Sequence, residues 1–258
     1  MIEIKGLTKR FGKKPVVEDV SVTIEPGTIT SFIGPNGAGK STLLSMVSRL
    51  LDADTGEVLV DKNNVKKWKS NEFAKRVSIL RQSNFINVRL TVRELVAFGR
   101  YPYSKGRLTD VDINYIEQAL DYMNLVNIQD KFLDELSGGQ KQRAFIAMVI
   151  AQDTEYILLD EPLNNLDMKH SVQIMKTLRR LVDDLGKTVI IVLHDINFAS
   201  VYSDRIVALK EGKLVKNGKT NEIINSTALR EIYDMDIPIQ EQNGCRICVY
   251  FNSHTEAN

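Results

Sequence analysis

A glycine-rich segment at residues 34–42, GPNGAGKST, lies between a β-like run and a helix-like pattern. It matches the pattern G-x-x-x-x-G-K-[ST] from Gly34 to Ser41. The preceding residues, ITSFI at 29–33, favour a short strand, and the apolar spacing over 41–51 is typical of an α-helix. A strand, a glycine loop and a helix in this order form the local structure that cradles nucleotide phosphates. The segment therefore predicts an α/β fold with a nucleoside triphosphate site.

Each residue type in this loop has a physical task. The glycines let the backbone bend so that its N–H groups converge on phosphate oxygens. The following helix adds the partial positive charge of its N-terminus. Lys40 supplies a point charge for the β- and γ-phosphates and is a predicted catalytic residue, and Ser41 offers a hydroxyl ligand to Mg²⁺. We predict nucleotide contacts from Gly34, Asn36, Gly37, Ala38, Gly39, Lys40, Ser41 and Thr42.

Two adjacent acids follow an apolar run at residues 156–159, YILL. Such a run predicts a buried strand, and ligands of open α/β sheets bind at the carboxyl ends of the strands. We predict that Asp160 is a direct or indirect Mg²⁺ partner and that Glu161 is the general base that activates a water molecule. Acids at a helix start can also serve only as caps.

Composition restricts the classes of partner. Lys and Arg total 34 and Asp and Glu 33, so the net charge is +1 and no overall basic field attracts nucleic acid. The longest apolar stretch, residues 144–151, is far shorter than the roughly 20 residues that span a bilayer. The N-terminus lacks the apolar core of a secretory signal, so a cytoplasmic protein is expected. Cys245 and Cys248 have no second cysteine pair with which to form a zinc site, and we interpret them as ordinary side chains.

Periodicity divides the chain into two kinds of region. Strand-like and helix-like patterns alternate over 1–83 and 152–258, with a predicted hairpin that turns at Glu211-Gly212. Residues 84–151 favour helices, of which one begins at Thr91 with Glu94 three residues later and another begins at Ser137. We predict one domain: a nucleotide-binding core with a β subdomain, interrupted by a helical subdomain at 84–151.

The string LSGGQ at 136–140, followed by KQR, resembles the signature of ATP-binding-cassette (ABC) ATPases. Physically, it is a serine and two glycines that open a helix, which is a second anion-binding site. The resemblance extends from Ile2 to about Tyr233. It implies a P-loop NTPase fold with an N-terminal antiparallel β subdomain and a helical insertion. It also implies ATP and Mg²⁺ as cofactors, and a head-to-tail homodimer in which the signature of one chain closes over the ATP of the other.

The resemblance assigns further residues. Ser137, Gly139 and Gln140 belong to the signature and contact the partner's nucleotide. Gln82 resembles the Q-loop residue that contacts Mg²⁺, and His194 resembles the switch histidine that donates to the γ-phosphate. Phe11 resembles the aromatic residue that stacks on adenine, although this position is commonly tyrosine. The D-loop reads Asn164-Asn165-Leu166-Asp167 in place of the common Ser-Ala-Leu-Asp, which leaves the dimer contacts of both asparagines open.

Three strings resemble one branch of the family: FGRYPY at 98–103, LDEPLNNLDMKHS at 159–171 and YDMDIPI at 233–239. They are similar to ATPases of ferric-siderophore, haem and cobalamin importers, and most similar to those of catecholate-type siderophore importers in Gram-positive bacteria. The resemblance implies two permease subunits, an extracytoplasmic substrate-binding protein and a location on the cytoplasmic face of the cell membrane. From the first string, Arg100, Tyr101 and Tyr103 are predicted to contact a permease helix, and the alternative is ordinary packing within the loop.

Other functions remain open at this point. The chain can be an ATPase for haem or cobalamin import, or for an exporter. A non-transport ABC ATPase of DNA repair or translation is a second class, but those proteins usually carry two cassettes or large inserts. A GTPase is disfavoured because no N-K-x-D string is present.

Overall fold

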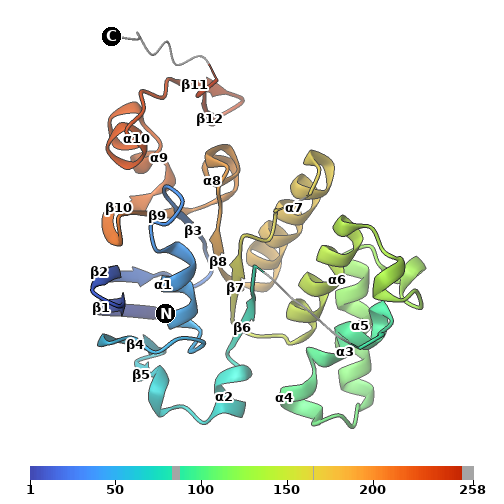
Figure 1. Ribbon diagram of the computed structural model, residues 1–258. Coiled ribbons are helices and arrows are strands. Elements are labelled where there is room, and N and C mark those ends of the chain that lie inside the picture. Colours follow the sequence, from blue (N-terminus) through green and yellow to red (C-terminus); the bar gives the residue numbers. More distant parts are fainter. Residues whose placement is uncertain (83–87, 165, 252–258) are drawn as a thin grey trace. The chain divides into compact units, whose positions relative to one another are not determined.

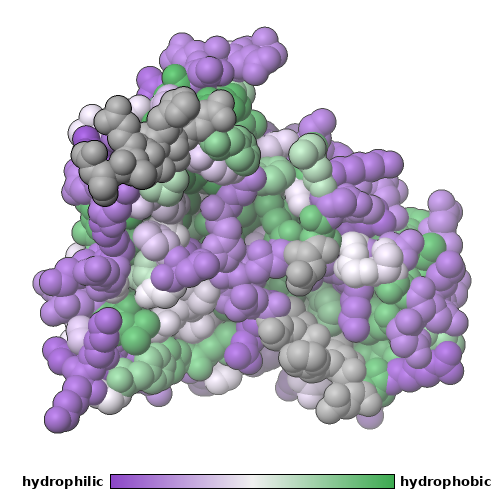
Figure 2. All heavy atoms as spheres, turned by 45° about the horizontal axis from the view of Figure 1, so that its top comes forward, coloured by the Kyte–Doolittle hydropathy of each residue, from purple (hydrophilic) through white to green (hydrophobic). Residues whose placement is uncertain are grey.

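The computed structural model describes residues 1–82, 88–164 and 166–251. They form two compact units, residues 1–66 with 190–258 and residues 67–189, and each unit is described by itself. Hydrophilic side chains cover much of the face in Figure 2. Among the described residues, no helix has both the length and the apolar composition needed to cross a membrane.

The first unit begins with an antiparallel sheet in the order β2-β1-β4-β5 (Figure 1). Ile2 and Ile4 of β1 face Ile24 and Val22 of β2, and all four are buried. Apolar and polar residues alternate along these strands, so one face of the sheet joins the core. The strands are β1 (Ile2–Phe11), β2 (Lys14–Ile24), β4 (Thr55–Val60) and β5 (Asn63–Asn64).

A second group of strands in this unit supports the glycine-rich loop. β3 (Ile29–Ile33) is buried at every residue and pairs in parallel with β9 (Arg205–Lys210). β9 turns into β10 (Lys213–Lys219) as the predicted hairpin. The loop after β3 leads into α1 (Lys40–Val47), which ends earlier than the expected residue 51 because the chain turns at Ser48 and Arg49.

The C-terminal part of the unit was not predicted from periodicity. It contains α8 (Ile196–Tyr202), α9 (Thr220–Ile223), α10 (Ser226–Tyr233) and a hairpin of β11 (Ile239–Gln242) and β12 (Cys245–Cys248). β12 packs against α8. Cys245 and Cys248 are both free thiols.

The second unit joins a parallel strand pair to a group of helices. β6 (Val77–Leu80) pairs with β7 (Tyr156–Asp160), and α7 (Met168–Leu185) leads from β7 toward β8 (Thr188–Val192). α3 (Val92–Phe98), α5 (Asp110–Tyr122) and α6 (Gly138–Ala151) pack on one another (Figure 1). The short helices are α2 (Ser70–Ala74) and α4 (Tyr101–Ser104), with 3-10 turns at Val65–Lys67, Val126–Ile128 and Leu133–Glu135.

The predicted helix starts at Thr91 and Ser137 are confirmed. Each residue is an N-cap with a complete capping box, to Glu94 and to Gln140. The structure adds a third box at Thr109 with Asp112. Caps are readable from sequence because their partners are only three residues apart.

Candidate functional site

The glycine-rich loop has a backbone that only glycine adopts without strain. Gly34 has φ +134°, and a Cβ atom built there would lie 1.9 Å from the carbonyl oxygen of Leu209. Gly39 has φ +98°, and its Cβ would lie 2.4 Å from the carbonyl oxygen of Val16. The loop is therefore pressed against β9 and β2 by backbone contacts that any side chain would break.

Lys40 is buried and its ammonium group is held over the loop. Its Nζ donates to the carbonyl oxygens of Gly34 at 2.7 Å and Pro35 at 2.9 Å. A cation fixed at the N-terminus of α1 favours an anion there, because the helix dipole and the loop N–H groups act in the same direction. Ser41 follows on the same helix, so its hydroxyl lies at the same end.

Two further predicted residues lie in this unit. Phe11 ends β1, and its ring is 58% exposed, so an aromatic face is available for stacking. His194 follows Leu193, whose N–H donates to the carbonyl oxygen of Phe32 at 3.2 Å. His194 therefore emerges beside the carboxyl end of β3, on the side where the phosphate loop begins.

The acid pair lies at the end of β7 in the second unit. Asp160 is 8% exposed. Glu161 comes next, with φ +51°, a left-handed conformation that is uncommon for a residue other than glycine. Strained backbone of this kind costs of order 1–3 kcal/mol and concentrates at functional sites.

Two amide groups converge on one carboxylate oxygen of Glu161. Gln82 Nε2 donates to Oε2 at 2.6 Å, and Asn164 Nδ2 donates to the same atom at 2.5 Å. The predicted Q-loop residue, Gln82, is therefore hydrogen-bonded to the predicted base, Glu161. The role of Asn164 was not predicted, because it depends on the turn after β7 and no local pattern encodes that turn.

The signature residues lie at the start of α6, in the same unit. Ser137 caps the helix by accepting the N–H of Gln140 at 3.3 Å, while Gln140 Oε1 accepts the N–H of Ser137. A Cβ on Gly139 would lie 3.4 Å from the ring of His170. Side chains at this position are therefore limited in size.

Asp167 of the predicted D-loop is the N-cap of α7. Its Oδ1 accepts the His170 N–H at 2.8 Å and lies 2.8 Å from Nδ1 of the ring. The backbone hydrogen bond from His170, followed by the one from the ring, lowers the pKa of Asp167. The carboxylate is thus held ionised. Asn165 lies outside the described residues.

The prediction that Arg100 contacts a permease helix is wrong. Its side chain is 3% exposed and forms a buried ion pair with Asp112 at 2.9 Å. Nη1 donates to the carbonyl oxygen of Ala151, and the guanidinium lies between the rings of Tyr103 and Tyr115. The spacing in FGRYPY did not reveal that Arg100 holds α5 and α6 together. Tyr101 is 60% and Tyr103 38% exposed.

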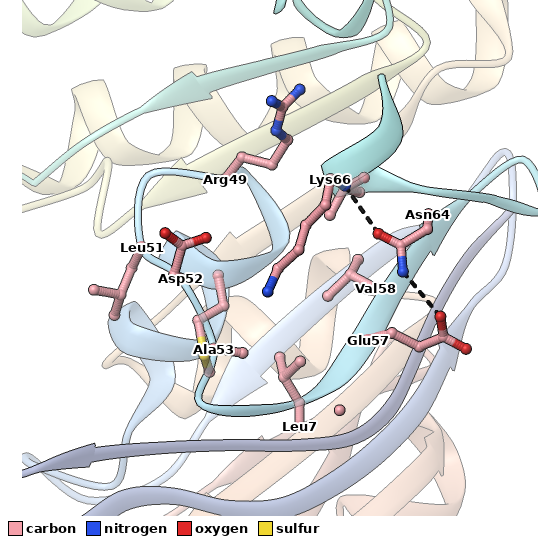
Figure 3. Close-up of a pocket in the computed structure, with 12 residues that line it drawn as sticks. Leu7, Arg49, Leu51, Asp52, Ala53, Glu57, Val58, Asn64 and Lys66 are labelled. Carbon is pink, nitrogen blue, oxygen red and sulfur yellow. Dashed lines mark hydrogen bonds between the residues drawn. The ribbon is translucent and has the colours of Figure 1, made fainter. Parts of the chain in front are cut away.

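The described part of the chain also contains two pockets, one in each unit. One, of about 400 Å³ in the first unit, lies between the end of α1 and β4 (Figure 3). Asn64 spans part of its wall by accepting the Lys66 N–H and donating to Glu57. None of the predicted site residues lines this pocket. The other, of about 340 Å³ in the second unit, is lined by Leu90, Glu94, Ala97, Phe98, Tyr101, Ser104, Gly106 and Leu108.

Comparisons with known proteins cover nearly the whole chain. The model of the ABC transporter family matches residues 17–164. The petrobactin import ATP-binding protein YclP of Bacillus subtilis (strain 168) is 64% identical over 252 residues, which cover 98% of this chain and 100% of that protein. The petrobactin import ATP-binding protein FatE of Bacillus anthracis is 49% identical, over 97% of this chain and 100% of that protein.

A solved structure has the same fold. The ATP-binding cassette MJ0796, in a dimeric post-hydrolysis state bound to ADP and phosphate, superposes with a TM-score of 0.76. It is 31% identical in sequence and covers 85% of this chain and 99% of its own.

Proposed function

We propose that this chain, which belongs to the ABC transporter family, is the ATP-hydrolysing subunit of an importer for iron–siderophore complexes. The full-length similarity to YclP carries the proposal. Both relatives described above, YclP and FatE, are named for petrobactin import, so ferric petrobactin is the first substrate to test. The chain acts on ATP, while the siderophore passes through its partners.

We assign one nucleotide to the residues predicted to bind it. The loop N–H groups and Lys40 hold the β- and γ-phosphates, and the exposed Phe11 ring stacks on the adenine. Glu161 accepts a proton from the attacking water, which bonds to the γ-phosphorus as the bond to the bridging oxygen of ADP breaks. His194 donates a hydrogen bond to the γ-phosphate.

The donor atoms also suit a magnesium ion. The Ser41 hydroxyl and the Asp160 carboxylate supply oxygen ligands. The amide N–H of Gln82 donates a hydrogen bond to Glu161, so the amide oxygen of Gln82 is the atom that can coordinate the ion. Mg²⁺ bound with the nucleotide neutralises charge on the phosphate oxygens. We assign the ion to these three residues.

The proposed transporter contains further chains. A second copy places its Ser137, Gly139 and Gln140 against the nucleotide, so that ATP is enclosed between two chains. Two permease subunits hold the dimer at the cytoplasmic face of the membrane, and an extracytoplasmic binding protein delivers the siderophore. Closure of the dimer on ATP drives the permease, and hydrolysis resets it.

The variant Glu161→Gln tests the enzymatic part. We expect it to bind ATP, to release phosphate roughly 10²–10⁴-fold more slowly than wild type, and to elute with MgATP at twice the 29.2 kDa of one chain. Glu117→Gln, an exposed residue of α5, is the matched control and should hydrolyse ATP normally. Phosphate release by Glu161→Gln at the wild-type rate would remove Glu161 from this role.

Iron uptake tests the transport part. Cells that lack the protein are complemented with wild type or with Glu161→Gln and offered radioactive iron as ferric petrobactin, ferric hydroxamate or haem. We expect loss of ferric petrobactin uptake that only the wild-type protein restores. Restoration of haem or hydroxamate uptake instead would assign the chain to that substrate. Unchanged uptake of all three would contradict a role in iron import.

A further inference from the structure

The first residue of the phosphate loop is tied to the C-terminal part of the chain. Gly34 is buried, and its N–H donates to the hydroxyl of Tyr233 at 3.1 Å. β3 ends at Ile33, which is the last residue of that strand in register with β9. A buried backbone N–H beyond the end of a strand needs a partner, because leaving it without one costs about 1–3 kcal/mol. Tyr233 supplies that partner.

The carbonyl group of the same residue, Gly34, contacts Lys40. The carbonyl oxygen of Gly34 accepts the Lys40 ammonium at 2.7 Å, so Gly34 joins Tyr233 to the charge that faces the phosphates. Gly34 is also packed closely against β9, since a Cβ atom built on it would lie 1.9 Å from the Leu209 carbonyl oxygen. A shift at Gly34 therefore moves Lys40 or breaks a contact with β9.

Tyr233 is itself held in place. Lys210, the last residue of β9, donates from Nζ to the carbonyl oxygen of Glu231 at 2.9 Å and to Asp234 at 2.7 Å, on either side of Tyr233. Ala228, Leu229 and Ile232 bury one face of α10. Burial, with the nearby Cys248 and Asp195, raises the pKa of Tyr233, so the hydroxyl stays protonated.

The surroundings of Tyr233 also include the turn that carries His194. Asp195 is the N-cap of α8, and Asn197 of that helix forms two hydrogen bonds with the backbone of Cys248, at 3.2 and 2.7 Å. Ser200 donates to the carbonyl oxygen of Arg246. The C-terminal hairpin therefore packs on the helix that follows His194, and Tyr233 lies in the same group of residues.

We propose that Tyr233 is a positioning residue for ATP: its hydroxyl fixes Gly34, and through Gly34 the Lys40 ammonium, in the geometry that binds the β- and γ-phosphates. This inference rests on the proposed ATPase function. The hydroxyl does not contact the nucleotide. It acts by keeping the buried N–H of Gly34 paired, so its loss weakens nucleotide binding more than it slows the chemical step.

The variant Tyr233→Phe removes only the hydroxyl. In the full chain, we expect the KM for MgATP to rise roughly fivefold with a smaller change in kcat, as for a lost hydrogen bond of about 1 kcal/mol. The Kd for MgATP, measured without turnover in a Glu161→Gln background, should rise by the same factor. Tyr202→Phe is the matched control, a half-buried tyrosine of α8 stacked on Phe198 in the same unit.

The two measurements separate the possible failures. An unchanged KM and Kd in Tyr233→Phe, whatever happens to its Tm, would overturn the positioning role and reduce Tyr233 to a packing residue. An equal rise in Tyr202→Phe would overturn it as well, because the effect would then not depend on Gly34. Absence of ATP binding by the wild-type chain would defeat the proposed function and this inference together.

Discussion

At the scale of single residues, the geometry of Glu161 depends on its neighbours. The left-handed backbone aims the side chain, and the amides of Gln82 and Asn164 hold one carboxylate oxygen. Hydrogen bonds to a charged group contribute about 1.5–3 kcal/mol each, more than neutral ones. The orientation of the base is therefore set by residues that sequence patterns assign to other tasks.

Asn164→Ala tests this arrangement without removing a proposed magnesium ligand. We expect kcat for ATP hydrolysis to fall roughly tenfold while the KM for ATP changes little, because the base loses the orienting contact from Asn164. Asn114→Ala, on the exposed face of α5, is the control. Steady-state hydrolysis of Asn164→Ala at the wild-type kcat would show that the base is oriented without Asn164.

At the scale of secondary-structure elements, local signals were predictable and tertiary ones were not. The strands at 29–33 and 156–159 and the hairpin turn at Glu211-Gly212 are as predicted, because alternation, apolar runs and turn residues are local. α10 and the β11–β12 hairpin were missed. Their short segments take their stability from contacts with α8 and β9, which no pattern within the segment contains.

Arg100 illustrates the same limit and gives a prediction about stability. In Arg100→Met, Asp112 stays buried without its cation, so the free energy of unfolding should fall by about 3–5 kcal/mol. Arg93→Met, which removes the more exposed pair with Glu117, should cost at most about 1 kcal/mol. Urea unfolding at pH 7 measures both. Equal losses in the two variants would contradict a special role for the buried pair.

The Arg100–Asp112 pair also gives the expected pH dependence. Burial alone would raise the pKa of Asp112, but hydrogen bonds from Thr109 and Arg100 outweigh it, and the pKa is lowered. A carboxyl group with a lower pKa in the folded state stabilises the protein above its unfolded pKa of about 3.9. That contribution is lost as the pH falls below about 4. Arg100→Met should show a smaller acid dependence, because it removes the Arg100 part while the hydrogen bonds from Thr109 remain.

At the scale of the whole molecule, the second unit carries an exposed apolar pocket. The pocket around Ala97 and Leu108 is apolar, and Phe98 and Tyr101 are more than half exposed beside it. Exposed aromatic side chains around an apolar hollow are typical of protein contacts. Because the family works with membrane subunits, we expect a cytoplasmic helix of the permease to occupy this pocket.

Tyr101→Glu tests that expectation. We expect the variant to co-purify poorly with the permease subunits and to restore little iron uptake, while the isolated chain hydrolyses ATP normally. Val111→Glu, which places the same charge on an exposed apolar position outside the pocket, should assemble as wild type does. Normal co-purification of Tyr101→Glu would place the permease elsewhere on the chain.

The motifs of the site could be predicted because each is a short string of neighbouring residues. The hydrogen bonds between residues far apart in the sequence could not. Lys40 and Glu161 can be identified from the residues next to them in the sequence. The partner of Gly34 lies 199 residues away, and only the folded chain brings Tyr233 to it.

That separation has a consequence for synthesis on the ribosome. Chains emerge from the N-terminus, so the strand, loop and helix of the phosphate site leave the exit tunnel long before α10 exists. Until Tyr233 has been translated, the N–H of Gly34 lacks its native acceptor. At a given concentration, ATP should therefore protect ribosome-bound chains from proteolysis less well before Tyr233 has been translated than after it.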